Sequence, residues 1–156
     1  RFGTLVLSPV KVLRYLRGES APADAAGHNP LGSLSVLALL LFLSAQVGTG
    51  LFSDDEIAAA GPLTGLVSGS VVSWATAYHK SVGKSVLIVL VLLHVVAILF
   101  YLWRRKENLI RPMISGDKAL PTPVPPARDD GRSRLFAAAL VAACSVVVVW
   151  VVRLGT

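Results

Sequence analysis

Two histidines lie in one apolar stretch of this sequence, and their spacing suits a chemistry that uses two separate sites. The stretch covers residues 79–103 and reads HKSVGKSVLIVLVLLHVVAILFYLW. At ~100° and ~1.5 Å per helical residue, His79 and His94 would lie about 60° apart around a helix and about 22 Å apart along it. Both imidazoles would project from one flank. They are too far apart for one metal ion, but two cofactors stacked across a membrane could use this spacing.

An imidazole at membrane depth indicates a bound partner, because an ionisable side chain is costly there unless it is paired. Neutral imidazole is a strong axial ligand of haem iron, and haem is largely apolar. Two haems at two depths would form an electron path across the bilayer. The alternative for His94 is a hydrogen bond to a neighbouring helix. The alternative for His79 is a position at the membrane surface, beside Lys80 and in contact with water.

Three other residues are candidates near such a cofactor. His28 precedes a helix start at Asn29-Pro30, where a hydrogen bond within the loop is the simplest role and a contact to a haem propionate or a quinone headgroup is the alternative. Lys80 and Lys84 could offset propionate charge near the outer haem. No glycine-rich phosphate loop, paired carboxylates or Ser-His-Asp pattern is present. No catalytic residue is therefore predicted.

The composition predicts how these residues are held. Of the 156 residues, 54% are hydrophobic and 15% are charged, against about 25% charged in soluble domains, which indicates an all-α integral membrane protein. The lone cysteine, Cys144, excludes a disulfide within the chain. We expect three transmembrane helices, at 31–52, 79–103 and 135–153. An interfacial helix and loop at 1–30 would precede the first of them. An outer loop at 53–78 and a basic, proline-rich loop at 104–134 would join the three.

The N-terminal segment predicts a short helix on the membrane surface. Ser8 can cap it, Pro9 suits its first position and Gly18 its end. Its basic side chains, Lys11, Arg14 and Arg17, lie near one face and would meet anionic lipid headgroups. A solvated surface helix fits the same pattern.

The basic residues also predict an orientation. Four of them precede the first span and eight lie in the loop at 104–134, whereas the loop at 53–78 has none. The positive-inside rule then puts the N-terminal segment and the basic loop in the cytoplasm and the C-terminus outside. Lys80 and Lys84 argue weakly against this. The net charge of +6 is explained in this way without a nucleic-acid partner.

Several motifs resemble the bacterial cytochrome b561 and nickel-iron-hydrogenase b-subunit family. The resemblance covers roughly residues 1–118, with its motifs in the right order and spacing. These are SPVKVLRYLRG near the start, GHNPLG at 27–32, TGLFSDDEIAAAGPL at 49–63, the helix with His79 and His94, and KENLIRPMISGDK at 106–118.

The resemblance implies a four-helix membrane protein that holds two b haems, each between two histidines. It also implies electron exchange between quinone and a redox partner such as a c-type cytochrome or a hydrogenase. The family's fourth core helix supplies one ligand to each haem, and His79 and His94 match that pair. The matching places the protein in a bacterial inner membrane, as an electron carrier or part of an oxidoreductase complex rather than a stand-alone enzyme.

This sequence departs from the family pattern, because the first two helices, which supply the opposite ligands, have no counterpart in it. Three explanations follow. The sequence is the C-terminal part of a longer protein, or other membrane subunits complete the bundle, or the protein has lost haem and is a structural subunit of a larger membrane complex. The leading hypothesis is a di-haem cytochrome b subunit, with His94 binding the haem nearer the cytoplasm and His79 the haem nearer the outside. The alternative is the scaffold.

Overall fold

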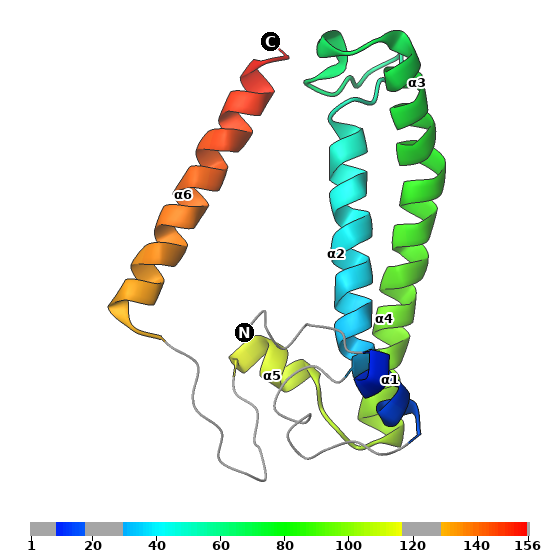
Figure 1. Cartoon of the computed structure of the whole chain (residues 1–156), viewed down its shortest axis with the longest axis vertical. Coiled ribbons are helices and arrows are strands. Elements are labelled where there is room, and N and C mark those ends of the chain that lie inside the picture. The colour runs from blue at the N-terminus through cyan, green and yellow to red at the C-terminus, as the bar shows by residue number, and fades with distance from the viewer. Residues whose placement is uncertain (1–8, 18–29, 117–128, 156) are drawn as a thin grey trace. The chain divides into compact units, whose positions relative to one another are not determined.

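The computed structural model describes residues 9–17, 30–116 and 129–155, and within them every regular element is a helix (Figure 1). The chain forms two compact units, one of residues 1–41 and 87–126, the other of residues 42–86 and 127–156. In chain order the elements are α1 (Pro9–Leu16), α2 (Pro30–Gly50), η3 (Thr64–Leu66), α3 (Gly69–Ala77), η4 (Tyr78–Gly83), α4 (Lys84–Arg104), α5 (Ile110–Ser115) and α6 (Gly131–Arg153).

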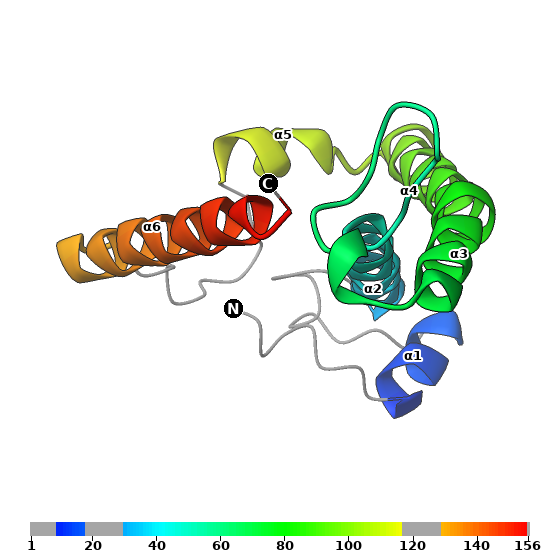
Figure 2. The same cartoon turned by 90° about the horizontal axis from the view of Figure 1, so that it is seen from above.

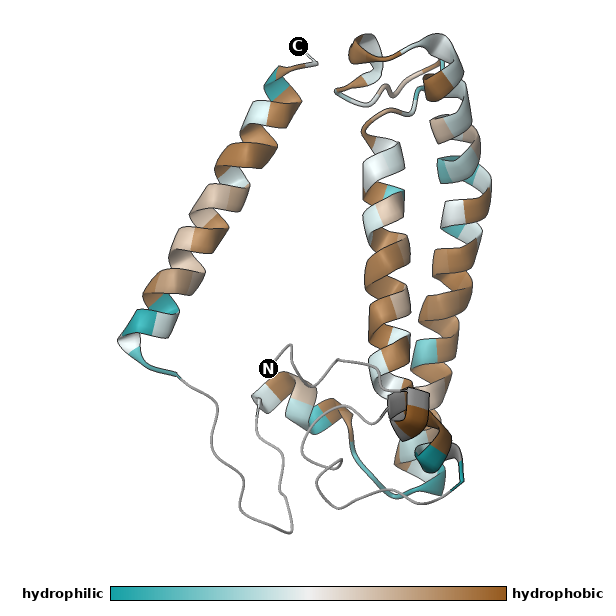
Figure 3. Ribbon diagram, in the orientation of Figure 1, coloured by the Kyte–Doolittle hydropathy of each residue, from teal (hydrophilic) through white to brown (hydrophobic). Residues whose placement is uncertain are grey.

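Three helical segments are long and apolar enough to span a membrane: Leu31–Gly50, Gly69–Arg104 and Gly131–Arg153. Hydrophobic residues dominate α2, α4 and α6 (Figure 3). Their side chains stay exposed; Leu41 and Val146 are each 68% exposed. Such surfaces would be unfavourable in water and are suited to lipid. The expected all-α membrane fold, with three spanning helices and a short N-terminal helix, is confirmed.

The second spanning segment begins earlier than the sequence predicts. Helix α3 starts at Gly69, after Ser68 in an extended conformation, and passes through the π-helical turn η4 into α4. The helical segment thus begins at Gly69, about ten residues before the start near His79 that the sequence predicts for the span. The glycine and serine at 68–70 act as the helix boundary, whereas the polar residues after Tyr78 do not interrupt the helix.

In the first unit, α2 lies beside α4, as Figures 1 and 2 both show. A hydrogen bond between Ser35 and His94 joins the two helices. Helix α1 is held to the end of α4 by a hydrogen bond between the hydroxyls of Tyr15 and Tyr101. Burial and this hydrogen bond raise the pKa of Tyr15 to about 12. The short N-terminal helix is thus attached to a spanning helix by a specific polar contact.

In the second unit, the connection after α2 folds back over the end of that helix. The N–H of Gly61 donates to the carbonyl of Ser53 at 2.7 Å, and Leu63 donates to Leu51 at 2.9 Å. A Cβ on Gly61 would lie 2.4 Å from the carbonyl oxygens of both Gly50 and Leu51, so only glycine allows this approach.

The same connection is tied to α3 and braced internally. The N–H of Asp54 donates to the Thr76 hydroxyl at 2.9 Å. One carboxylate oxygen of Asp55 accepts from three backbone N–H groups, those of Ile57, Ala58 and Ala59. These donors favour the charged form and lower the pKa of Asp55 to about 2. The acidic turn is therefore an ordered structure rather than a loose loop.

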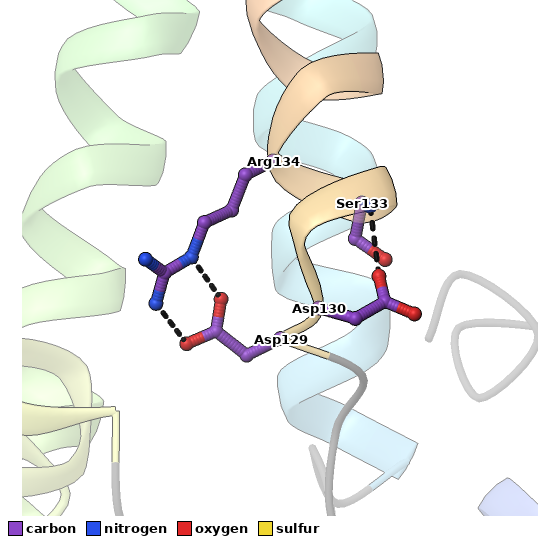
Figure 4. Close-up of polar contacts among 4 residues, drawn as sticks. All are labelled: Asp129, Asp130, Ser133 and Arg134. Atoms are coloured by element: carbon purple, nitrogen blue, oxygen red, sulfur yellow. Dashed lines mark hydrogen bonds and ion pairs between the residues drawn. The ribbon is translucent and has the colours of Figure 1, made fainter.

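Helix α6 begins four residues before the expected boundary at 135, because acidic residues organise its start (Figure 4). Asp130 is the N-cap and accepts from the N–H of Ser133 at 2.8 Å. Arg134 donates twice to Asp129, at 2.9 Å, and this guanidinium holds the pKa of Asp129 below its usual value. The loop expected at 104–134 also contains the short helix α5, whose first N–H groups are accepted by Asn108.

Candidate functional site

His79 lies in the π-helical turn η4 and its ring is held by α2. The Nδ1 atom is 2.9 Å from the carbonyl oxygen of Gln46, and the Thr49 hydroxyl is 3.5 Å from the same nitrogen. A carbonyl oxygen can only accept, so Nδ1 carries the proton. Nε2 then has a free lone pair, and it has no hydrogen-bond partner among the described residues. A half-buried imidazole in this state is prepared to bind a metal through Nε2.

Gln46 contacts His79 a second time, through its side chain. The Nε2 of Gln46 donates to the backbone carbonyl of His79 at 3.0 Å. Two glycines allow this close approach of helices. A Cβ on Gly83 would lie 2.0 Å from Oε1 of Gln46, and a Cβ on Gly50 would lie 2.9 Å from Cε1 of the His79 ring. The ring and the backbone of His79 are therefore both fixed by the last two turns of α2.

His94 lies in the middle of α4 and is held differently. Its Nδ1 is 3.1 Å from the hydroxyl oxygen of Ser35, in the first part of α2. This is the hydrogen bond to a neighbouring helix that the alternative interpretation of His94 expects. It uses only one ring nitrogen, so Nε2 remains available here as well. A hydroxyl can donate or accept, so Ser35 does not decide which nitrogen of His94 carries the proton.

The π turn affects the geometry expected from the sequence. The rotation of about 60° between His79 and His94 assumes an α-helix throughout. A π turn joins residue i to i+5 and takes up one additional residue. Because His79 lies in η4 and His94 lies in α4, that estimate does not apply to the folded helix.

The other predicted site residues have fewer ties. Lys80 in η4 and Lys84 at the start of α4 are both exposed, and the charge of Lys80 contributes weakly to lowering the pKa of Asp55. His28 lies outside the described residues. Asp54 and Glu56 line an open surface hollow of about 630 Å³ that reaches Thr64 and Thr76.

Sequence reasoning did not identify the residues of α2 and η4 that hold the histidines. Gln46 is a polar side chain in an otherwise apolar span, but nothing in the sequence names its partner. Glycines in a spanning helix indicate only close helix packing or a bend. The residues found here are Ser35, Gln46, Thr49, Gly50 and Gly83.

The donor set fits haem better than a bare metal ion. Within residues 9–17, 30–116 and 129–155, no group of three or more His, Cys, Asp or Glu side chains could hold a metal ion. Haem iron already has four ligands from its ring and needs single axial imidazoles, each oriented through its other nitrogen. His79 and His94 both fit that requirement, since each has Nδ1 engaged and, in the described part of the chain, no partner at Nε2.

The fold and the donor set define a class: a multi-pass, all-helical membrane protein with two single imidazoles on one spanning segment. A family model described as prokaryotic cytochrome b561 matches residues 2–116, and the chain belongs to this family. Membership implies a membrane b-type cytochrome that binds haem b and acts in electron transfer together with other redox components. Neither the curated proteins nor the solved structures contain a significant match.

Proposed function

We propose that this protein carries electrons between quinone and a redox partner through b haems whose axial ligands include His79 and His94. The observation that supports the proposal best is the shared state of the two rings. Each presents Nε2 without a partner among the described residues, while Nδ1 is held by α2. A histidine that only joins two helices would also make the contact between His94 and Ser35, so the haem content of the His94 variant distinguishes the two roles.

Haem b would supply a one-electron carrier, and the protein would supply its ligands, its apolar surroundings and nearby charge. The sequence has three histidines, whereas two haems with two histidines each need four. We therefore propose that neighbouring membrane helices, or other membrane subunits, contribute ligands. Lys80 and Lys84, both exposed, would offset propionate charge near His79, and His28 would contact a haem propionate or a quinone headgroup.

The proposed setting is a bacterial inner membrane, with the N-terminal segment cytoplasmic and the C-terminus periplasmic. Support comes from the charges at the end of α4, since Arg104, its last residue, and Arg105 and Lys106, which follow it, are all exposed. The acidic turn at the opposite end would face the periplasm. A c-type cytochrome or hydrogenase-like partner with a basic surface could dock there, guided by exposed Glu56.

The test is a reduced-minus-oxidised visible spectrum, with haem quantification, on the purified protein and on His79→Ala and His94→Ala variants. Leu93→Ala is the matched control, because Leu93 precedes His94 and is 60% exposed. We expect each histidine variant to lose one haem and the control to lose none. Haem content unchanged in both histidine variants would refute the ligand assignment. A protein without haem, whose variants assemble normally, would instead be the structural subunit.

A further inference from the structure

We propose that Gln46 is a positioning residue for His79, acting through its main chain on the imidazole and through its side chain on the π turn. This inference rests on the proposed function, because it gives His79 its role as an axial ligand. The geometry is reciprocal. The Gln46 carbonyl oxygen lies 2.9 Å from Nδ1 of His79, and the Gln46 amide nitrogen lies 3.0 Å from the His79 carbonyl oxygen.

The side-chain hydrogen bond acts where the helix departs from α geometry. His79 is the second residue of the six-residue π turn at Tyr78–Gly83. Such turns shift backbone hydrogen bonds from i+4 to i+5 partners, which changes the direction of the side chains they carry. An additional donor to the His79 carbonyl favours this local conformation. Gln46 would thereby control the direction in which Nε2 points, and not only the proton on Nδ1.

The oxygen of the Gln46 amide indicates that this side chain contributes little to the stability of the fold. Its Oε1 is buried and is the one such side-chain atom of the described residues without a hydrogen-bond partner. An unsatisfied buried acceptor is unfavourable, whereas the Nε2 bond to His79 is favourable. Replacement by leucine removes both, so the stability of the fold should change little. An effect confined to His79 would then reveal positioning.

Gly83 provides a second, independent way to displace the amide. A Cβ there would lie 2.0 Å from Oε1 of Gln46 and 2.9 Å from Cε1 of Tyr78. Gly83→Ala should push the flexible amide away from the His79 carbonyl while leaving Gln46 itself unchanged. Gly48→Ala is the matched control, since Gly48 lies in the same part of α2 and a Cβ there meets no atom within 4 Å.

The experiment is a haemin titration of the purified full chain in lipid nanodiscs. The His79 site is isolated in a His94→Ala background and the His94 site in a His79→Ala background. We expect Gln46→Leu and Gly83→Ala to weaken haemin binding at the His79 site by about 10-fold or more, the usual effect of losing a group that orients a ligand. Binding at the His94 site, and all binding by Gly48→Ala, should be unchanged.

A second readout needs no haem. The ¹⁵N shifts of the imidazole in the haem-free protein report which ring nitrogen is protonated, and thermal unfolding reports the fold. We expect His79 to be protonated on Nδ1 in the unsubstituted chain. Gln46→Leu keeps the main-chain carbonyl but removes the side-chain donor to the π turn, so we expect the ring to move away from that carbonyl and show a mixture of tautomers, with similar unfolding temperatures. A merely structural role would lower the unfolding temperature and leave the tautomer alone.

The outcomes separate the two proposals. Equal losses at both haem sites, or wild-type affinity and tautomer in Gln46→Leu, would overturn the positioning role while the ligand assignment stands. If the His94→Ala and His79→Ala single-site chains bind haemin no differently from the double variant, the proposed function fails first, and the positioning role fails with it.

Discussion

The regions around His79 and His94 both hold an imidazole against α2, but they hold it by different numbers of contacts. His79 is held at its ring and its backbone by Gln46, in a π turn that contacts Gly50 across the helix pair. His94 has a single hydroxyl, that of Ser35, in a regular α-helix. A carbonyl fixes the tautomer and a hydroxyl leaves it open. The difference indicates a tightly specified site at one end of the helix pair and a more adaptable one towards the other.

The surroundings of the two histidines differ in the same sense. Near His79 lies the ordered connection between α2 and α3, which packs closely on the end of α2 at Gly61 and is hydrogen-bonded to α3 at Thr76. Near His94 the neighbouring side chains are aliphatic and largely exposed, from Val95 at 46% to Val96 at 61%. Lipid or further helices must complete the environment of His94, whereas much of the environment of His79 is built by this chain.

The largest effect is expected from a substitution in the constrained region, in the connection after α2. Gly61→Ala would put a Cβ within 2.4 Å of two backbone carbonyl oxygens, so the connection must move away from α2. We expect a local loss of about 2 kcal/mol, typical of overpacking, or roughly 30-fold faster amide exchange at Gly61 and Leu63. Exchange near Ser35 should not change. Gly65→Ala, with open space around it, is the control, and equal exchange in both variants would contradict this account.

A smaller effect tests the adaptable region. Ser35→Ala removes the hydroxyl that joins α2 to Nδ1 of His94, at a cost of about 1 kcal/mol in the free energy of unfolding. Unfolding in mixed micelles would measure it. Ser145→Ala, which removes only a hydroxyl bonded to its own helix at Val141, is the matched control. A Ser35→Ala chain as stable as that control would mean that the contact to His94 holds nothing in place.

The smallest effect is expected from the titration of Asp55, which stabilises the connection near His79 and not the region of His94. The folded pKa of Asp55, about 2, lies below its ordinary value of 3.8, so the stability it gives is present above pH 3.8 and is lost as the pH falls towards 2. The amide signals of Ala58 and Ala59 should titrate with a midpoint near 2, and those near His94 should not. Asp55→Asn should abolish the titration. A midpoint near 3.8 would show that the three backbone donors do not favour the carboxylate.

Much of this fold could be predicted from the sequence, because a spanning helix is recognised from the hydropathy of some twenty consecutive residues without knowing which residues it contacts. The three spanning helices, the helix from Pro9 and the family were all predicted correctly. The assignment of His79 and His94 as ligands stays a prediction. The role of Gln46 could not be foreseen, since it depends on two turns of α2 meeting residues more than thirty positions later. Nor does YHKSVG carry a signal for π geometry.

The π turn has a consequence for anyone who aligns or edits this helix. Because the turn accommodates one residue beyond the α repeat, it absorbs that residue without turning α3 relative to α4. Removing one residue from Tyr78–Gly83 would restore the α repeat and leave both flanking helices in phase, whereas the same deletion within α3 or α4 would turn every side chain on one side of it by about 100° about the helix axis. A one-residue gap at this place in an alignment therefore changes the direction of the side chains inside the turn, His79 among them, and not the register of the helices around it.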